Sequence, residues 1–139
     1  MRVFFDASVI IAAMLSPTGG SALLLKYTKT KVIDGITSQT AIDEILDKTE
    51  KLHKSAKDIG QFINVSKLLV RKSITFDEVT PYVDLVDKED AHLIAGAKLT
   101  NCKYLVTLDK KHLLRADIQK RFLPLQILSP KDLLEEIML

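Results

Sequence analysis

Short apolar runs alternate along the chain with segments in which apolar residues recur one helical turn apart. The apolar runs predict strands at residues 3–5, 31–36, 73–76, 104–108 and 125–128. The one-turn periodicity predicts helices after Asp6, over residues 21–28, 41–52, 55–70, 87–99 and 111–115, and after Ser129. Strands that alternate with helices are typical of a mostly parallel sheet covered on both faces. We therefore expect an α/β fold of three layers, α/β/α.

Length and composition limit the class of protein. The chain has 139 residues, the size of one domain, so we expect residues 1–139 to form a single domain. Hydrophobic residues make up 47% of it and charged residues 27%, which excludes general disorder. The single cysteine, Cys102, excludes an internal disulfide and a cysteine-based zinc site. Asp6 and the loop at residues 16–20 interrupt the apolar segments, so we expect no signal peptide, no membrane span and a cytoplasmic location.

Two of the predicted strands end abruptly in an aspartate. Asp6 follows the first strand, and Asp109 follows the strand at residues 104–108. In an open parallel sheet, ligands bind outside the carboxyl ends of the strands, where the strand order reverses, and both aspartates would lie on that edge. The alternative is that each aspartate is the N-cap of the helix that follows it.

Two further acids occupy unusual positions. Asp90 lies on the inward stripe of the helix at residues 87–99, although it also fits a capping box in which Asp87 is the cap. Glu44 borders the apolar stripe of an earlier helix, where a solvated side chain is the alternative. If these four acids converge, their hard oxygen ligands suit Mg²⁺ or Mn²⁺. Without a metal such a cluster repels itself, so it is costly to keep for structure alone.

The basic residues say less about function than the acidic residues do. The net charge of +2, from 20 Lys and Arg against 18 Asp and Glu, is too even to indicate nucleic-acid binding. A basic segment follows Asp109 directly and contains Lys110, Lys111, His112 and Arg115. It either steers the phosphates of an RNA strand or forms the solvated end of a helix. The three histidines show no metal-ligand spacing, and we expect no catalytic role for them.

Taken together, the chain resembles the PIN-domain ribonucleases, the group that includes the VapC toxins of toxin–antitoxin pairs. Four segments carry the resemblance by their order and spacing: residues 5–8, 38–44, 87–97 and 105–109. The resemblance covers nearly the whole chain. It implies a PIN-like α/β/α fold whose central sheet has four or five parallel strands, with the first strand in the middle.

The resemblance also implies a site. It places four catalytic acids around one metal ion: Asp6, Glu44, Asp90 and Asp109. It implies that Ser8 supports Asp6 by hydrogen bonding, and Thr107 matches a hydroxyl that the family often keeps two residues before its last acid. Asp87 is either a fifth acid near the site or the cap of its helix.

These features predict an endoribonuclease that depends on Mg²⁺ or Mn²⁺. A metal-activated water would attack phosphorus in line and leave a 5′-phosphate and a 3′-hydroxyl. Glu44 or Asp90 would hold that water or accept its proton. RNA is the expected substrate, and a cognate antitoxin protein and a second copy of the chain are the candidate protein partners. Whether the protein is a toxin or an RNA-processing enzyme stays open.

Two other classes of function are consistent with parts of the pattern. One is a catalytically silent PIN scaffold that binds RNA or protein, although the presence of all four acids favours the enzyme. The other is a receiver-type phosphoacceptor domain. That domain needs adjacent acids after its first strand, and Asp6 has no acidic neighbour.

Overall fold

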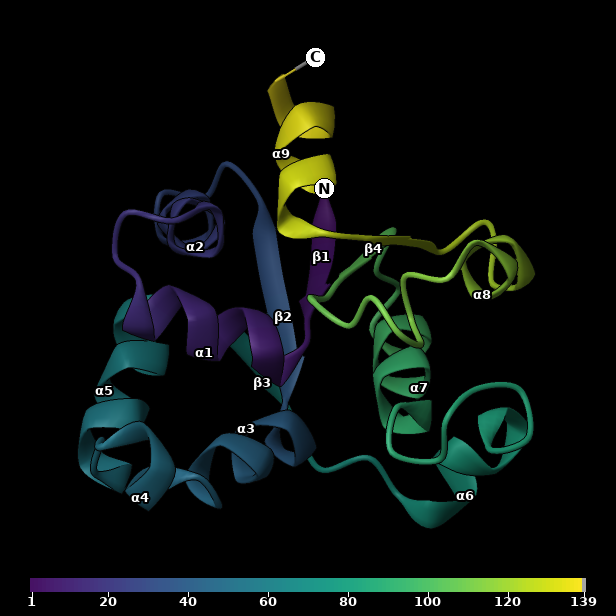
Figure 1. Cartoon of the computed structure of the whole chain (residues 1–139), viewed down its shortest axis with the longest axis horizontal. Coiled ribbons are helices and arrows are strands. Elements are labelled where there is room, and N and C mark those ends of the chain that lie inside the picture. The colour runs from purple at the N-terminus through teal and green to yellow at the C-terminus, as the bar shows by residue number, and fades with distance from the viewer. Residues whose placement is uncertain (139) are drawn as a thin grey trace.

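The computed structural model describes residues 1–138, which contain one parallel sheet (Figure 1). Its five strands are β1 (Arg2–Phe5), β2 (Asp34–Ser38), β3 (Leu69–Arg71), β4 (Tyr104–Val106) and β5 (Gln126–Leu128). They lie in the order β3-β2-β1-β4-β5, and all neighbouring strands are parallel. The prediction of an α/β fold with the first strand central is therefore confirmed, and the described sheet is parallel throughout.

Helices cover both faces of the sheet and complete the three layers (Figure 1). They are α1 (Ala7–Leu15), α2 (Gly20–Lys29), α3 (Gln39–Leu46), α4 (Thr49–Leu52), α5 (Ala56–Val65), α6 (Phe76–Val79), the 3₁₀ helix η1 (Thr80–Tyr82), α7 (Ala91–Leu99), α8 (Ala116–Arg121) and α9 (Pro130–Met138). Side chains from α1, α2, α3, α5 and α9 form the core on one face, and side chains from α7 and α8 form it on the other. Alternate residues of β1 supply both cores, because Val3 and Phe5 point to the first and Phe4 to the second.

The carboxyl ends of β1 and β4 lie side by side. Phe5 is opposite Val106 in the register of the two strands, and the backbone N–H of Asp6 donates to the Val106 carbonyl at 3.1 Å. β2 pairs with the other side of β1, so the order of the strands reverses at β1. Ligands of open parallel sheets bind at such a reversal, and the residues that follow β1 and β4 are placed there together.

Gly96 allows α7 to pack close to β1. A Cβ atom at this position would lie 2.5 Å from the ring of Phe4, so a larger residue would push the helix away from the sheet. Because α7 leads into the parallel strand β4, its N-terminal end faces the carboxyl edge of the sheet. The close packing therefore brings the residues before α7 to the same edge as Asp6.

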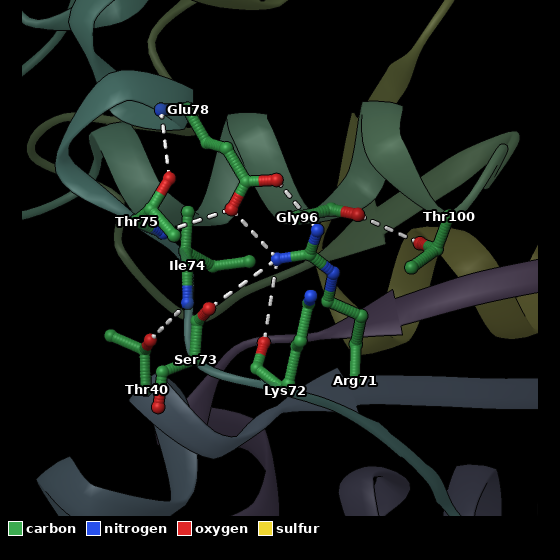
Figure 2. Close-up of polar contacts among 9 residues, drawn as sticks. All are labelled: Thr40, Arg71, Lys72, Ser73, Ile74, Thr75, Glu78, Gly96 and Thr100. Carbon is green, nitrogen blue, oxygen red and sulfur yellow. Dashed lines mark hydrogen bonds and ion pairs between the residues drawn. The ribbon is translucent and has the colours of Figure 1, made fainter.

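The strand predicted at residues 73–76 is wrong, and the helix predicted over residues 55–70 is present but shorter. α5 ends at Val65, and Lys67 has a left-handed φ of 60° that turns the chain into β3. Residues 73–76 instead lead into α6, where Thr75 forms a capping box with Glu78 (Figure 2). A short strand and then a capped turn follow α5 here, and the apolar pattern alone did not separate them.

Two other predicted helices have different bounds. The helix predicted over residues 87–99 begins at Ala91, because residues 87–90 form a turn in which the Asp90 N–H donates to the Asp87 carbonyl at 2.9 Å. Residues 111–115 form a turn rather than a helix, and the helix of this region, α8, begins at Ala116. Both errors concern turns in which aspartate side chains bind the local backbone, and both lie beside the candidate site.

Smaller differences concern the second strand and the third helix. β2 begins at Asp34 and includes Ser38, whose Oγ then caps α3 by accepting from the Ala41 N–H at 3.1 Å. The helix predicted over residues 41–52 is divided into α3 and α4. No single helix of residues 1–138 is long and apolar enough to cross a membrane; α1 and α2 reach that length only together, and they are bent by 101°.

Candidate active site

Asp6 is the buried centre of the acidic group. It follows β1, is 8% exposed, and its Oδ2 accepts hydrogen bonds from the Thr107 Oγ1 at 2.7 Å and the Ser8 Oγ at 3.0 Å. Its carboxylate makes no cap hydrogen bond to α1, so the N-cap alternative does not explain the side chain. Burial raises the pKa of Asp6, the two hydroxyls lower it, and the nearby Glu44 carboxylate raises it.

The two hydroxyls also join the ends of β1 and β4. The Ser8 Oγ accepts from the Leu108 N–H at 3.2 Å, and the Thr107 Oγ1 accepts from the Asp109 N–H at 3.1 Å. Each hydroxyl thus donates to Asp6 and accepts from the backbone of the segment that carries Asp109. This network fixes the two strand ends, and therefore the two aspartates, relative to each other.

Asp90 brings a third carboxyl group to the same edge. Burial raises the pKa of Asp90 to about 7, and the neighbouring carboxylates of Asp109, Asp6 and Asp87 contribute in that order of size. Asp90 occupies the N-cap position of α7 without a cap hydrogen bond from its side chain. The predicted capping box is therefore absent, and Asp87 instead accepts from the Glu89 N–H at 3.1 Å within its own turn.

Asp109 lies beside His112, a histidine whose spacing in the sequence predicts no metal site. Its Oδ1 accepts from the His112 N–H at 3.2 Å, and its Oδ2 lies 3.3 Å from the His112 Nδ1. The other ring nitrogen, Nε2, lies 3.7 Å from the Asp87 Oδ2. Asp90, Asp109 and His112 each offer a ligand atom, and these atoms lie within 4.8 Å of one another.

Glu44 lies on α3 and is near enough to Asp6 to raise its pKa. Its Oε1 lies 2.6 Å from the Nε2 of His92, a buried residue of α7. This contact is close but is not aligned as a hydrogen bond, and His92 Nδ1 has no hydrogen-bond partner within residues 1–138. Glu44 is thus near Asp6 electrostatically but outside the tight group formed by Asp90, Asp109 and His112.

Neither histidine was predicted from the sequence to belong to the site. His112 is three residues after Asp109, and a turn rather than a regular element brings its ring back to the carboxylate. His92 is two residues after Asp90, which on a helix directs it away from that acid and toward α3. The recurrence of acid and histidine in residues 90–92 and 109–112 is the one signal in the sequence that points to these contacts.

The basic segment after Asp109 is exposed at the rim. Lys110 and Lys111 are exposed and form no ion pair within residues 1–138, whereas Arg115 is held by Asp117 at 2.8 Å. A pocket of about 300 Å³ adjoins the acids, because its lining includes Asp87 and His112, which lie beside Asp90 and Asp109. Arg115 and Arg121 also line this pocket, so the acids are bordered by space and by positive charge.

The donor set fits a hard divalent cation. The carboxyl groups of Asp6, Asp90 and Asp109 lie near one another, and among residues 1–138 the one imidazole found in contact with them is that of His112, beside Asp109. Mg²⁺ and Mn²⁺ prefer such carboxylate oxygens, and a cation would relieve the repulsion that raises the pKa of Asp90. The arrangement can therefore hold a metal and polarise a bound water or phosphate.

The comparisons with known proteins agree with the fold. The family model that matches is described as a PIN domain, and it covers residues 2–111. No curated protein matches the chain at a significant level. Among solved structures, VapBC2 from Rickettsia felis bound to a promoter DNA fragment aligns with a TM-score of 0.64 and 15% identity over 93% of this chain and 98% of that one.

Two further structures align nearly as well. A toxin–antitoxin complex from Klebsiella pneumoniae has a TM-score of 0.61 and 17% identity, over 92% of this chain and 97% of that chain. FitAB bound to an IR36 DNA fragment has a TM-score of 0.61 and 15% identity, over 92% and 94%. At these identities the likeness shows a shared fold.

Proposed function

The chain belongs to the PIN-domain family, and from that premise we propose that it is a divalent-metal-dependent endoribonuclease. The observation that carries the proposal is the convergence of acids from separate parts of the chain. Asp6, Asp90 and Asp109 come from three segments, and their mutual repulsion contributes to the raised pKa of Asp90. Carboxyl groups that raise one another's pKa are typical of a site kept for function.

We assign Asp6, Asp90 and Asp109 as metal ligands, with Glu44 next to them. A bound Mg²⁺ or Mn²⁺ would supply Lewis acidity to the scissile phosphate and lower the pKa of a bound water. Ser8 and Thr107 hold Asp6 in place, because both hydroxyls donate to its Oδ2 and fix the orientation of the carboxylate. Glu44 or Asp90 accepts the proton from the water whose oxygen attacks phosphorus in line. The P–O3′ bond breaks, and the departing 3′ oxygen takes a proton from solvent, which leaves a 5′-phosphate and a 3′-hydroxyl.

We also propose that the protein is the toxin of a toxin–antitoxin pair. The structures that align with it along nearly their whole length are described as VapBC2, FitAB and a toxin–antitoxin complex. An antitoxin protein is accordingly the proposed partner, and a second copy of the chain is another. A cytoplasmic location fits an enzyme that acts on RNA and has a single cysteine, Cys102.

The test of the proposed function is cleavage of single-stranded RNA of varied sequence. We expect cleavage with Mg²⁺ or Mn²⁺, no cleavage with EDTA, and recovery when the metal is restored in excess. Asp47→Asn is a suitable control for variants that remove a carboxylate of the proposed site, because it removes one carboxylate from an exposed position at the end of α3. A folded protein that binds RNA but cuts none of these substrates with metal present would support the catalytically silent PIN scaffold instead.

The basic rim has its own test. Changing Lys110 and Lys111 to Ala should weaken RNA binding for all sequences, because these exposed cations would contact phosphates rather than bases. Loss of two contacts to a single strand should reduce the slope of log affinity against log salt by about 1.4. Lys26 and Lys29 on α2 provide the control pair. An unchanged slope in a titration across salt concentrations would mean that the segment is a solvated turn.

A further inference from the structure

We propose that the His112 Nδ1 is a nitrogen ligand of the metal, that Asp87 orients its ring, and that the site therefore prefers Mn²⁺ to Mg²⁺. This inference rests on the proposed metal-dependent function and adds the choice of metal to it. The starting observation is that the three groups whose ligand atoms lie within 4.8 Å of one another are Asp90, Asp109 and His112, so the group includes an imidazole.

The spacing of the donor atoms suits a single ion. Ligand bonds of 2.0–2.1 Å at right angles place neighbouring donors about 3 Å apart, and opposite donors about 4 Å apart. The His112 Nδ1 lies 3.3 Å from the Asp109 Oδ2, which is close to the separation of neighbouring donors. The 4.8 Å limit of the whole group requires only a small contraction around an ion. Rotation of exposed side chains provides it, because the side chain of His112 is 48% exposed.

The other face of the ring explains Asp87. Histidines that bind metals usually donate their second N–H to a carboxylate, which fixes the tautomer and the orientation of the ring. The His112 Nε2 lies 3.7 Å from the Asp87 Oδ2, so a small approach completes such a contact. The turn at residues 87–90 holds Asp87 in place through the Glu89 N–H. Asp87 is then neither a metal ligand nor a helix cap but the residue that positions the imidazole.

The ligand type decides which metal is favoured. Carboxylates alone accept Mg²⁺ and Mn²⁺ alike, whereas an imidazole adds affinity for the transition metal, and Mg²⁺ gives up its waters reluctantly. The sequence Asp-Lys-Lys-His at residues 109–112 thus places a hard oxygen and a softer nitrogen on one turn. The same turn keeps Lys110 and Lys111 exposed, so the ligands and the basic rim do not compete.

The experiment measures metal binding without RNA. Isothermal titrations give the dissociation constants of Mn²⁺ and Mg²⁺ for the wild type, His112→Ala and the control His53→Asn, which removes an exposed histidine at a left-handed position that Asn tolerates. We expect His112→Ala to weaken the binding of Mn²⁺ by about tenfold or more and that of Mg²⁺ by less than about threefold. Pulsed EPR of bound Mn²⁺ should show ¹⁴N coupling in the wild type and in His53→Asn, and none in His112→Ala.

Two other variants separate ligand from scaffold. Asp87→Ala should weaken Mn²⁺ about tenfold and Mg²⁺ little, since it leaves the imidazole without its orienting carboxylate. In His112→Asn an amide oxygen replaces the ring nitrogen, so the ¹⁴N coupling and the preference for Mn²⁺ should both disappear while Mg²⁺ still binds.

Three results would overturn the inference. They are equal loss of both metals in His112→Ala, unchanged Mn²⁺ binding in that variant, and a wild type without ¹⁴N coupling. Equal loss would mean that the histidine only positions Asp109. A protein that binds Mn²⁺ through His112 but cuts no RNA would instead overturn the proposed ribonuclease and leave the metal assignment standing.

Discussion

Two carboxylates near the carboxyl edge of the sheet have opposite electrostatic environments. Glu78 on α6 faces the Arg71 guanidinium at the end of β3, with its two oxygens 2.9 Å and 2.6 Å from the two terminal nitrogens (Figure 2). The hydrogen bonds from Arg71 lower the pKa of Glu78 to about 2. Asp90 forms no such ion pair within residues 1–138, and burial together with three neighbouring carboxylates raises its pKa to about 7.

The difference distinguishes a carboxylate that stabilises the fold, Glu78, from one that serves the candidate site, Asp90. Arg71 also donates to the carbonyls of Lys72 and Ser73, and Ile74 donates to Thr40, so the pair organises the connection from β3 to α6 (Figure 2). The Asp90 side chain forms no comparable support, because it makes no cap hydrogen bond to α7 and is repelled by the carboxylates around it. We infer that Arg71 and Glu78 support the fold, and that Asp90 is retained at a cost to the fold.

Cleavage of RNA should give the largest contrast. We expect Asp90→Asn to reduce the rate at least about 100-fold, equivalent to about 2.7 kcal/mol, because it removes a metal ligand. Glu78→Gln should keep the rate within about twofold, since Glu78 contacts Arg71 and the turn at Thr75 instead of the acids. Single-turnover cleavage assays on the folded variants provide the measurement. Similar rates for Asp90→Asn and the wild type would remove Asp90 from the site.

Stabilisation by metal should give the second contrast. A ligand that binds only the folded state adds RT ln(1 + [L]/Kd), about 2.7 kcal/mol when the metal is at 100 times its dissociation constant. The wild type and Glu78→Gln should show this increase with Mn²⁺, and Asp90→Asn should show much less. Denaturation curves with metal and with EDTA provide the measurement. If Asp90→Asn responds to metal like the wild type and is less stable than it in EDTA, Asp90 is a structural residue.

The dependence of metal-free stability on pH should give the smallest contrast, with opposite signs. The folded-state pKa of Asp90 is raised. Its contribution to the free energy of unfolding is therefore complete below its ordinary pKa of 3.8 and is lost as the pH rises through about 7. Asp90→Asn should therefore match or exceed the wild type above pH 7, by up to about 1 kcal/mol after screening of this half-exposed group.

Glu78 should behave in the opposite way. Because its pKa is lowered, its contribution to the free energy of unfolding is present above its ordinary pKa of 4.5 and is lost as the pH falls through about 2. Glu78→Gln should thus be less stable than the wild type near neutral pH and converge with it in strong acid. Urea denaturation in EDTA from pH 2 to pH 9 tests both variants. Parallel curves for the two variants would mean that their environments do not differ as the geometry indicates.

The sequence was most informative where a residue's role follows from the strand that carries it. The apolar runs before Asp6 and Asp109 predicted two parallel strands and put both aspartates at one edge, because parallel strands share their carboxyl ends. That β1 and β4 are neighbours was open from spacing alone. It is fixed by pairing between residues about 100 positions apart, such as Phe4 and Leu105, which no local pattern encodes.

The sequence was least informative in the turns. The turns at residues 87–90 and 111–115 were expected to be helical, and their true course brings Asp87 and His112 together. Aspartates that bond to the backbone of their own turn compete with helix formation, and the apolar period does not report this competition. Likewise, the contact between His92 and Glu44 joins two helices, and depends on how both pack against the sheet.

The central position of β1 has a consequence for the time at which the protein becomes complete. Asp6 and its partner Thr107 are 101 positions apart in the chain, so Asp6 is synthesised well before it. On the ribosome, β1 emerges long before β4, so Asp6 lacks the strand β4 and the Thr107 hydroxyl until that later segment has been made. The acids cannot assemble until the segment with Asp109 has left the exit tunnel. A nascent chain of this protein therefore carries no finished site beside the message that encodes it.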